Sequence, residues 1–149
     1  MSDHAITLEV DLAAPAERVG RALTVASEMQ RWMGDEEMPI EVVLEPVLGG
    51  RAVFRATHEM PIEARGVVVA LVPCERLAYT HLADISALPE LAESYATLDF
   101  SLARIEPRAT RLTLHLVGAP TESIEQPLVL YWRASLEMLR RHVEAHDGA

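Results

Sequence analysis

The sequence contains no lysine, no asparagine and only one cysteine, Cys74. Its 13 basic residues are therefore all arginine, and 23 acidic residues give a formal net charge of −10. Nucleic-acid binding needs a basic face that neutralises phosphates, so the charge argues against a nucleic-acid partner and against docking on anionic lipid. A lone cysteine excludes an internal disulfide and a cysteine metal cluster.

Long hydrophobic runs are also missing, since none approaches the roughly 20 residues of a membrane span. The first residues lack the basic and apolar regions of a signal peptide, so we expect a cytoplasmic protein without membrane insertion. Half of the 149 residues are nevertheless hydrophobic, which suffices for a core. We expect one domain that covers residues 1–149.

The last part of the chain carries the clearest helical pattern. From Pro127 to about His146, apolar residues recur at helical spacing and form one stripe. These residues are Leu128, Trp132, Leu136, Leu139 and Val143. A long closing helix that follows many strands needs a concave sheet to lie in, and this arrangement often encloses a cavity.

Most of the preceding chain alternates apolar and polar residues, which predicts strands. Two short helices are expected after the first strand, at 15–26 and 27–33, because Pro15 suits a first helical position. Strands are expected at 6–12, 40–44, 51–57, 62–72, 76–82, 95–103 and 111–117. The sequence therefore predicts an α+β fold in which a curved antiparallel sheet of six to seven strands wraps around the C-terminal helix. Residues 84–93 form the longest loop, either a lid or an ordinary connection.

These elements and several local motifs resemble the activator of heat-shock-protein-90 ATPase homologue-like family. This family belongs to the START and birch-pollen-allergen superfamily, the SRPBCC proteins, and the resemblance implies a helix-grip fold over nearly the whole chain. The motifs are APAERV at 14–19, Trp32, Gly49-Gly50, Gly66 with Val68, PCERL at 73–77, TRLT at 110–113, and Tyr131-Trp132 with Leu136 and Leu139.

One position departs from that family. Gly20 stands where the family usually has an aromatic residue in the first helix. Either a neighbour such as Met29 or Trp132 fills the space, or the cavity is enlarged. In the second case, Gly20→Phe should weaken ligand binding.

The phase of the strand at 76–82 places Leu77, Tyr79 and His81 on one face. Apolar pockets use a few polar groups to orient a ligand, so Tyr79 and His81 are candidates for the cavity wall. A His–Tyr pair could also act in acid–base chemistry, but the sequence shows no group that would activate a substrate. The residues we expect to bind a ligand are Trp32, Met33, Tyr79, His81, Phe100, Leu128, Trp132 and Leu136.

Other polar residues allow two interpretations each. His142 and His146, four apart on a helix, could bind a metal, but a helix end favours imidazoles without one. Glu63, Arg65 and Arg55 could clamp a carboxylate ligand or form ion pairs on the outer face. His58 and His115 lie on predicted strands, and the phase of His115 places it on the outer face. Four methionines could rim the cavity or belong to the core, namely Met29, Met33, Met38 and Met60.

Enzyme motifs are mostly missing, and the sequence has no nucleophile elbow, P-loop or dinucleotide fingerprint. His58-Glu59 begins like a zinc-protease motif, but a second histidine is absent and Pro61 forbids the helix. We therefore expect no metal and no cofactor. We expect a protein that binds a small hydrophobic ligand, such as a lipid, aromatic or polyketide-like compound, in the cavity between the sheet and the C-terminal helix. The alternatives are a polyketide cyclase or aromatase activity and a chaperone-linked protein-interaction module. The last two are implied by the resemblance alone, and an exposed strand edge could support a homodimer.

Overall fold

The computed structural model describes residues 5–34, 37–57, 61–83, 91 and 94–145. Within them, the elements follow in the order of one strand, two short helices, six strands and a long helix. Their bounds are β1 (Ala5–Leu12), α1 (Ala16–Thr24), α2 (Ala26–Met33), β2 (Ile40–Leu44), β3 (Arg51–Thr57), β4 (Pro61–Val72), β5 (Arg76–Ala83), β6 (Ala96–Glu106), β7 (Ala109–Val117) and α3 (Glu122–Ala145).

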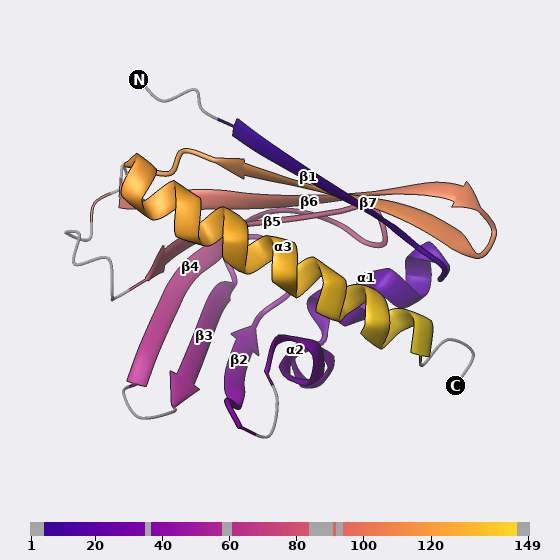
Figure 1. The fold of residues 1–149 in the computed structure, drawn as a ribbon, viewed down its shortest axis with the longest axis horizontal. Coiled ribbons are helices and arrows are strands. Elements are labelled where there is room, and N and C mark those ends of the chain that lie inside the picture. Colours follow the sequence, from indigo (N-terminus) through magenta and orange to yellow (C-terminus); the bar gives the residue numbers. More distant parts are fainter. Residues whose placement is uncertain (1–4, 35–36, 58–60, 84–90, 92–93, 146–149) are drawn as a thin grey trace.

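The strands form a single seven-stranded sheet in the order β1-β7-β6-β5-β4-β3-β2, and every neighbouring pair is antiparallel. Figure 1 shows the curved sheet with α3 lying across its concave face, while α1 and α2 sit beside the C-terminal half of α3. The predicted α+β helix-grip architecture is therefore confirmed, including the two short helices after the first strand.

The core lies between the inner face of the sheet and α3. Alternate residues along each strand face inward because the side-chain period of a strand is two. In β7, for example, Leu112, Leu114 and Leu116 are buried, whereas Thr113 and His115 are partly exposed. Each fully buried side chain of this size stabilises the fold by roughly 1.5–3 kcal/mol.

The two short helices form a corner that packs against α3. Val25, which separates α1 from α2, has an extended backbone at φ −98° and ψ 116°, and this ends α1 two residues earlier than we predicted. The indole Nε1–H of Trp32 donates to the carbonyl of Ala22 over 2.9 Å. That hydrogen bond attaches α2 to α1 in the core.

The long helix begins earlier than the sequence indicated. We predicted a start at Pro127, but α3 starts at Glu122, and the hydroxyl of Thr121 accepts the backbone N–H of Ile124 over 3.3 Å. Threonine is a favoured N-terminal cap because it satisfies one of the free N–H groups of the first turn. Pro127 lies inside the helix, so the carbonyl of Ser123 lacks its usual donor four residues later. His146 lies outside the described residues.

Gly20 does not enlarge a ligand cavity, contrary to one of our two alternatives. A Cβ atom there would lie 3.3 Å from Cα and 3.5 Å from Sγ of Cys74. Cys74 occupies the turn between β4 and β5 at a positive φ of 64°. The turn itself therefore fills the space above Gly20, in place of the Met29 or Trp132 side chain that we expected, and leaves a void of about 20 Å³.

Candidate functional site

A cavity of about 460 Å³ opens between the sheet and the N-terminal half of α3. This volume lies within the roughly 300–1,000 Å³ that is typical of small-molecule pockets. Strands β2 to β6 supply one wall and α3 supplies the other. The lining residues are Met33, Met38, Ile40, Phe54, Ala56, Ala64, Tyr79, His81, Leu82, Ala83, Ser94, Ala96, Pro120, Ser123, Ile124, Pro127, Leu128, Tyr131 and Trp132.

The cavity has a deep aromatic end. Phe54, Tyr79 and Trp132 are 7%, 1% and 2% exposed. The rings of Phe54 and Tyr79 lie 5.5 Å apart, and Phe100, one layer further in, meets Trp132 edge to face at 5.4 Å. Such aromatic pairs contribute roughly 0.5–1.5 kcal/mol each beyond their buried area, so the floor of the cavity is a packed aromatic layer.

The other end of the cavity opens toward solvent. Met38 is 52% exposed and Tyr131 is 45% exposed. Ser123 and Pro127, one helical turn apart on α3, are exposed on the same side. The hydroxyl groups of Tyr131 and Ser123 therefore lie toward the outer, solvent-facing end of the cavity.

His81 is the most polar group of the sheet wall. Burial lowers its pKa from 6.5 to about 4, and a backbone hydrogen bond opposes this shift only in part. The imidazole is therefore neutral at physiological pH, with one nitrogen as donor and the other as acceptor. Tyr79 stays protonated as well, because burial raises the pKa of its phenol, and partial burial raises the pKa of Tyr131 against the opposing effect of a hydrogen bond with Ser135.

The structure brings together most, but not all, of the residues that we predicted to bind a ligand. Met33, Tyr79, His81, Leu128 and Trp132 line the cavity. Three further residues, Trp32, Phe100 and Leu136, are buried in the core and are not among the described residues that line it. Trp32 lies behind Trp132, with 6.2 Å between the ring centroids. The alternation of apolar residues shows which side chains face inward, but it could not distinguish those that line the cavity from those buried in the core behind it.

Other wall residues were missed by the sequence analysis. Phe54 has the inward phase of β3, between Ala52 and Ala56, and this alternation was a usable signal. Pro120, Ser123 and Ile124 were missed because we placed the start of the helix at Pro127.

The charged residues of β3 and β4 lie on the outer face. Arg55 donates to Glu63 over 2.8 Å and pairs with Glu41 at 3.3 Å, and Arg65 lies 3.8 Å from Glu63. All four side chains are 31% to 62% exposed. The interpretation as surface ion pairs is confirmed. His115 also faces outward, where its Nδ1 lies 3.0 Å from the Thr7 hydroxyl.

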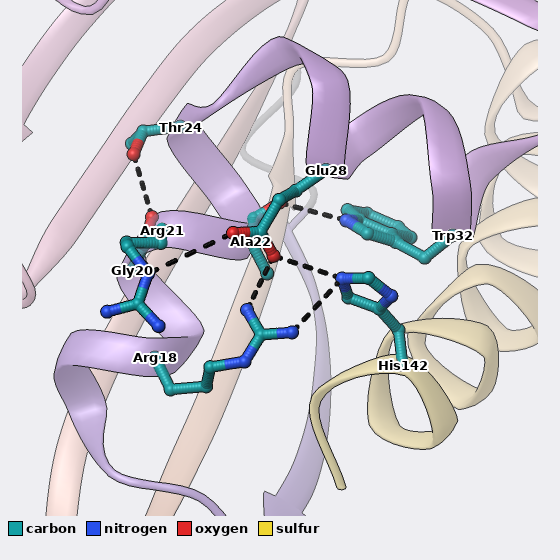
Figure 2. A network of polar contacts seen from close by, with 8 residues as sticks. All are labelled: Arg18, Gly20, Arg21, Ala22, Thr24, Glu28, Trp32 and His142. Carbon is teal, nitrogen blue, oxygen red and sulfur yellow. Dashed lines mark hydrogen bonds and ion pairs between the residues drawn. The ribbon is translucent and has the colours of Figure 1, made fainter. Parts of the chain in front are cut away.

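A second polar group lies at the corner of α1, α2 and α3, away from the cavity (Figure 2). We call Arg18, Glu28 and His142 the corner cluster. Arg18 donates to Glu28 Oε1, and His142 Nε2 lies 3.0 Å from the same oxygen. Burial pushes the pKa of Glu28 upward, but the hydrogen bonds with His142 and Arg18 outweigh it and the pKa is lowered.

The corner cluster explains His142 without a metal. Its Nε2 also lies 3.3 Å from Arg18, but only a hydrogen on Nε2 makes the shorter contact with the carboxylate a hydrogen bond. Among the described residues, no group of three or more histidine, cysteine, aspartate or glutamate side chains could hold a metal.

Some of our candidates lie outside the described residues. These are His58, Met60 and every residue of the proposed lid at 84–93 except Leu91. No helix in the described part of the chain is both long and apolar enough to cross a membrane.

Solved structures of bacterial proteins share this architecture. A protein from Chromobacterium violaceum is 28% identical, with a TM-score of 0.79, and the alignment covers 94% of this chain and 96% of that one. A Nitrosomonas europaea protein is 18% identical, with a TM-score of 0.78 and 97% coverage of both chains. A Mycobacterium smegmatis protein is 17% identical, with a TM-score of 0.76 and coverage of 96% and 90%.

No curated protein sequence matches this one significantly. The sequence profile described as "Activator of Hsp90 ATPase homolog 1-like protein" matches residues 13–144, which run from just after β1 to the penultimate residue of α3. The match includes both walls of the cavity and the corner cluster. The chain belongs to the family of activator of Hsp90 ATPase homolog 1-like proteins.

Proposed function

We propose that this protein binds a small hydrophobic ligand in the cavity between the sheet and α3. The observation that carries the proposal is the cavity itself, about 460 Å³ in volume and lined mostly by apolar side chains. Water in an apolar space of this size would leave the apolar wall hydrated. A ligand that displaces the water would gain roughly 25 cal/mol of binding free energy for each Å² of apolar surface removed from water.

The chemistry of the wall supports binding more than catalysis. Acid–base catalysis works best when the pKa of the catalytic group lies near the working pH. Burial moves the pKa of His81 down to about 4 and that of Tyr79 upward, so both move away from neutrality. These two residues are suited to donating and accepting hydrogen bonds, and their role would be to orient the ligand in the cavity.

The direct test uses the neutral dye N-phenylnaphthylamine, whose fluorescence rises in an apolar environment. The variant Ala64→Phe places a ring into the cavity, because Ala64 lines it from β4 and is 9% exposed. Val69→Phe is the matched control, since Val69 lies on the same strand but is 48% exposed. We expect saturable binding by the wild type and the control, and an affinity at least about tenfold lower for Ala64→Phe.

Equal dye binding by all three proteins would contradict the proposal, because the dye would then bind elsewhere. An increase in dye fluorescence that does not saturate would contradict it as well. Mass spectrometry of freshly purified protein, native and then denatured, would identify a compound that is lost on denaturation.

A further inference from the structure

The distribution of positive charge in this molecule restricts the ligand further. The chain has no lysine, and all 13 arginines lie in the described part of the structure. None of the 13 is among the residues that line the cavity. The cavity therefore offers neither a guanidinium nor an ammonium group from a side chain to a bound anion.

Most of the arginines form ion pairs outside the cavity. Arg18 belongs to the buried corner cluster, while Arg55 and Arg65 pair with glutamates on the outer face of the sheet. Others also form ion pairs outside the cavity, namely Arg51, Arg76, Arg104, Arg111, Arg140 and Arg141. A ligand carboxylate could not recruit one of the paired side chains without breaking its ion pair.

Acidic residues flank the lining residues at the outer end of the cavity, and their charge has the wrong sign to attract an anion. The first turn of α3, which lines the outer end of the cavity through Ser123 and Ile124, carries Glu122 and Glu125. Their carboxylates counteract the partial positive charge that a helix N-terminus would otherwise present. The net charge of −10 adds a repulsive field over the whole molecule.

The polar groups that do line the cavity are uncharged. His81 is held neutral by burial, and the phenols of Tyr79 and Tyr131 keep their hydrogens. Among the described lining residues, the remaining polar side-chain groups are the hydroxyls of Ser94 and Ser123 and the indole N–H of Trp132. Such groups pair well with a hydroxyl, ketone or amide, whereas a buried carboxylate without a cation costs far more than these hydrogen bonds return.

We propose that the ligand is an uncharged, mainly apolar molecule whose single hydroxyl or carbonyl group meets His81, and that the cavity rejects the same molecule when it carries a carboxylate or sulfonate. This inference rests on the proposed function and specifies its ligand class. It excludes free fatty acids and other hydrophobic anions as the preferred ligands and favours alcohols, ketones and neutral aromatic compounds.

Two matched pairs of compounds test the inference at pH 7. Decanol and decanoate share one chain length and differ in head group, and both are titrated against bound N-phenylnaphthylamine. Anilinonaphthalenesulfonate is that dye with an added sulfonate. We expect decanol to displace the neutral dye at a concentration at least about tenfold lower than decanoate, and the sulfonated dye to bind at least about tenfold more weakly than the neutral one.

A gain-of-function variant adds an independent test. His81→Arg places a cation at the cavity wall, and His115→Arg adds the same charge on the outer face. We expect only His81→Arg to shift the preference toward decanoate, by about tenfold or more relative to the wild type. Circular dichroism and thermal unfolding establish that each variant is folded, and the wild-type comparison stands even if His81→Arg does not fold.

The outcomes separate the two proposals. If the neutral dye binds in the cavity but decanoate competes as well as decanol, the inference about charge is wrong while the proposed function stands. If the neutral dye does not bind in the cavity, both are wrong.

Discussion

At the scale of single residues, His81 combines a polar side chain with an apolar environment, and this has a consequence for stability. Its pKa is about 4 in the folded protein and near 6.5 in the unfolded chain. Between these pH values the unfolded chain binds the proton more readily, so stability falls as the pH falls from 6.5 to 4. Above pH 6.5 both states are neutral at this residue and the effect vanishes.

We therefore predict that the wild type loses about 3 kcal/mol more unfolding free energy than His81→Gln between pH 7 and pH 4. Glutamine keeps the ability to donate and accept a hydrogen bond but does not titrate. Urea unfolding at several pH values within this range measures the difference, with His115→Gln as the control for an exposed histidine. Parallel pH curves for the wild type and His81→Gln would show that His81 is not buried as described.

The corner cluster supports a second prediction at this scale. Glu28→Gln removes the carboxylate that neutralises Arg18, whose side chain is 9% exposed, and weakens the contact with His142. Because a buried charge without its partner is costly, we expect a loss of about 2 kcal/mol in unfolding free energy. Chemical unfolding checks this value.

The matched control for the corner cluster is Glu17→Gln. Glu17 on α1 also pairs with an arginine, Arg104, but both side chains are more than half exposed. Exposed ion pairs contribute little because water and salt screen them. Equal destabilisation by the two substitutions would contradict the structural role that we assign to burial at the corner.

At the scale of secondary-structure elements, α3 has two halves with different tasks. Its N-terminal half carries Ser123, Pro127 and Leu128 into the cavity wall, whereas its C-terminal half joins α1 and α2 through His142. Pro127 lies in the half that faces the cavity and removes one backbone hydrogen bond there. The helix is thus less firmly held where a ligand would lie than where the core is closed.

We predict that Pro127→Ala raises the unfolding free energy by about 1–3 kcal/mol, because the restored N–H can donate to the carbonyl of Ser123. Thermal and urea unfolding would measure the gain. A stability equal to or below that of the wild type would indicate that the rigid proline ring contributes more to packing at Leu128 and Ile124 than the hydrogen bond does.

The helices and strands also show which parts of the fold could be predicted from the sequence. Strand positions followed from period-two alternation, and most predicted bounds agree with the structure within one or two residues. The start of α3 was predicted wrongly because Pro127 suits a first helical turn, while the capping residue Thr121 with the acidic first turn gave a competing signal. A neighbour fills the space at Gly20, as one of our two alternatives held, but its identity could not be predicted because Cys74 is 54 positions away in the chain and no local pattern reveals that contact.

At the scale of the whole molecule, the sheet grips α3 at one end and leaves a cavity at the other. Residues of the inner face could be predicted by phase, but their division into core and cavity wall could not. Phe100 and Tyr79 have the same phase on neighbouring strands, yet only Tyr79 lines the cavity. This division depends on how far the helix lies from each strand, which is a property of the complete fold.

Ligand binding at such an internal site should stabilise the entire domain. A ligand that binds only the folded state at about 100 times its Kd adds about 2.7 kcal/mol to the unfolding free energy. We predict that decanol raises the melting temperature of the wild type in a concentration-dependent manner and leaves that of Ala64→Phe nearly unchanged. Differential scanning calorimetry measures both, and equal shifts for the two proteins would contradict binding in the cavity.

The two tryptophans have different surroundings, and this difference can be used in fluorescence spectroscopy. Trp132 lines the cavity, and within the described structure its buried indole N–H has no hydrogen-bond partner. Trp32 lies behind it with its N–H bonded to Ala22. The chain thus has one fluorescent indole, that of Trp132, that faces the cavity and one, that of Trp32, that does not. Replacing Trp32 by phenylalanine would leave Trp132 as the single tryptophan, and its emission wavelength, excited where tyrosine does not absorb, would report directly on what occupies the cavity.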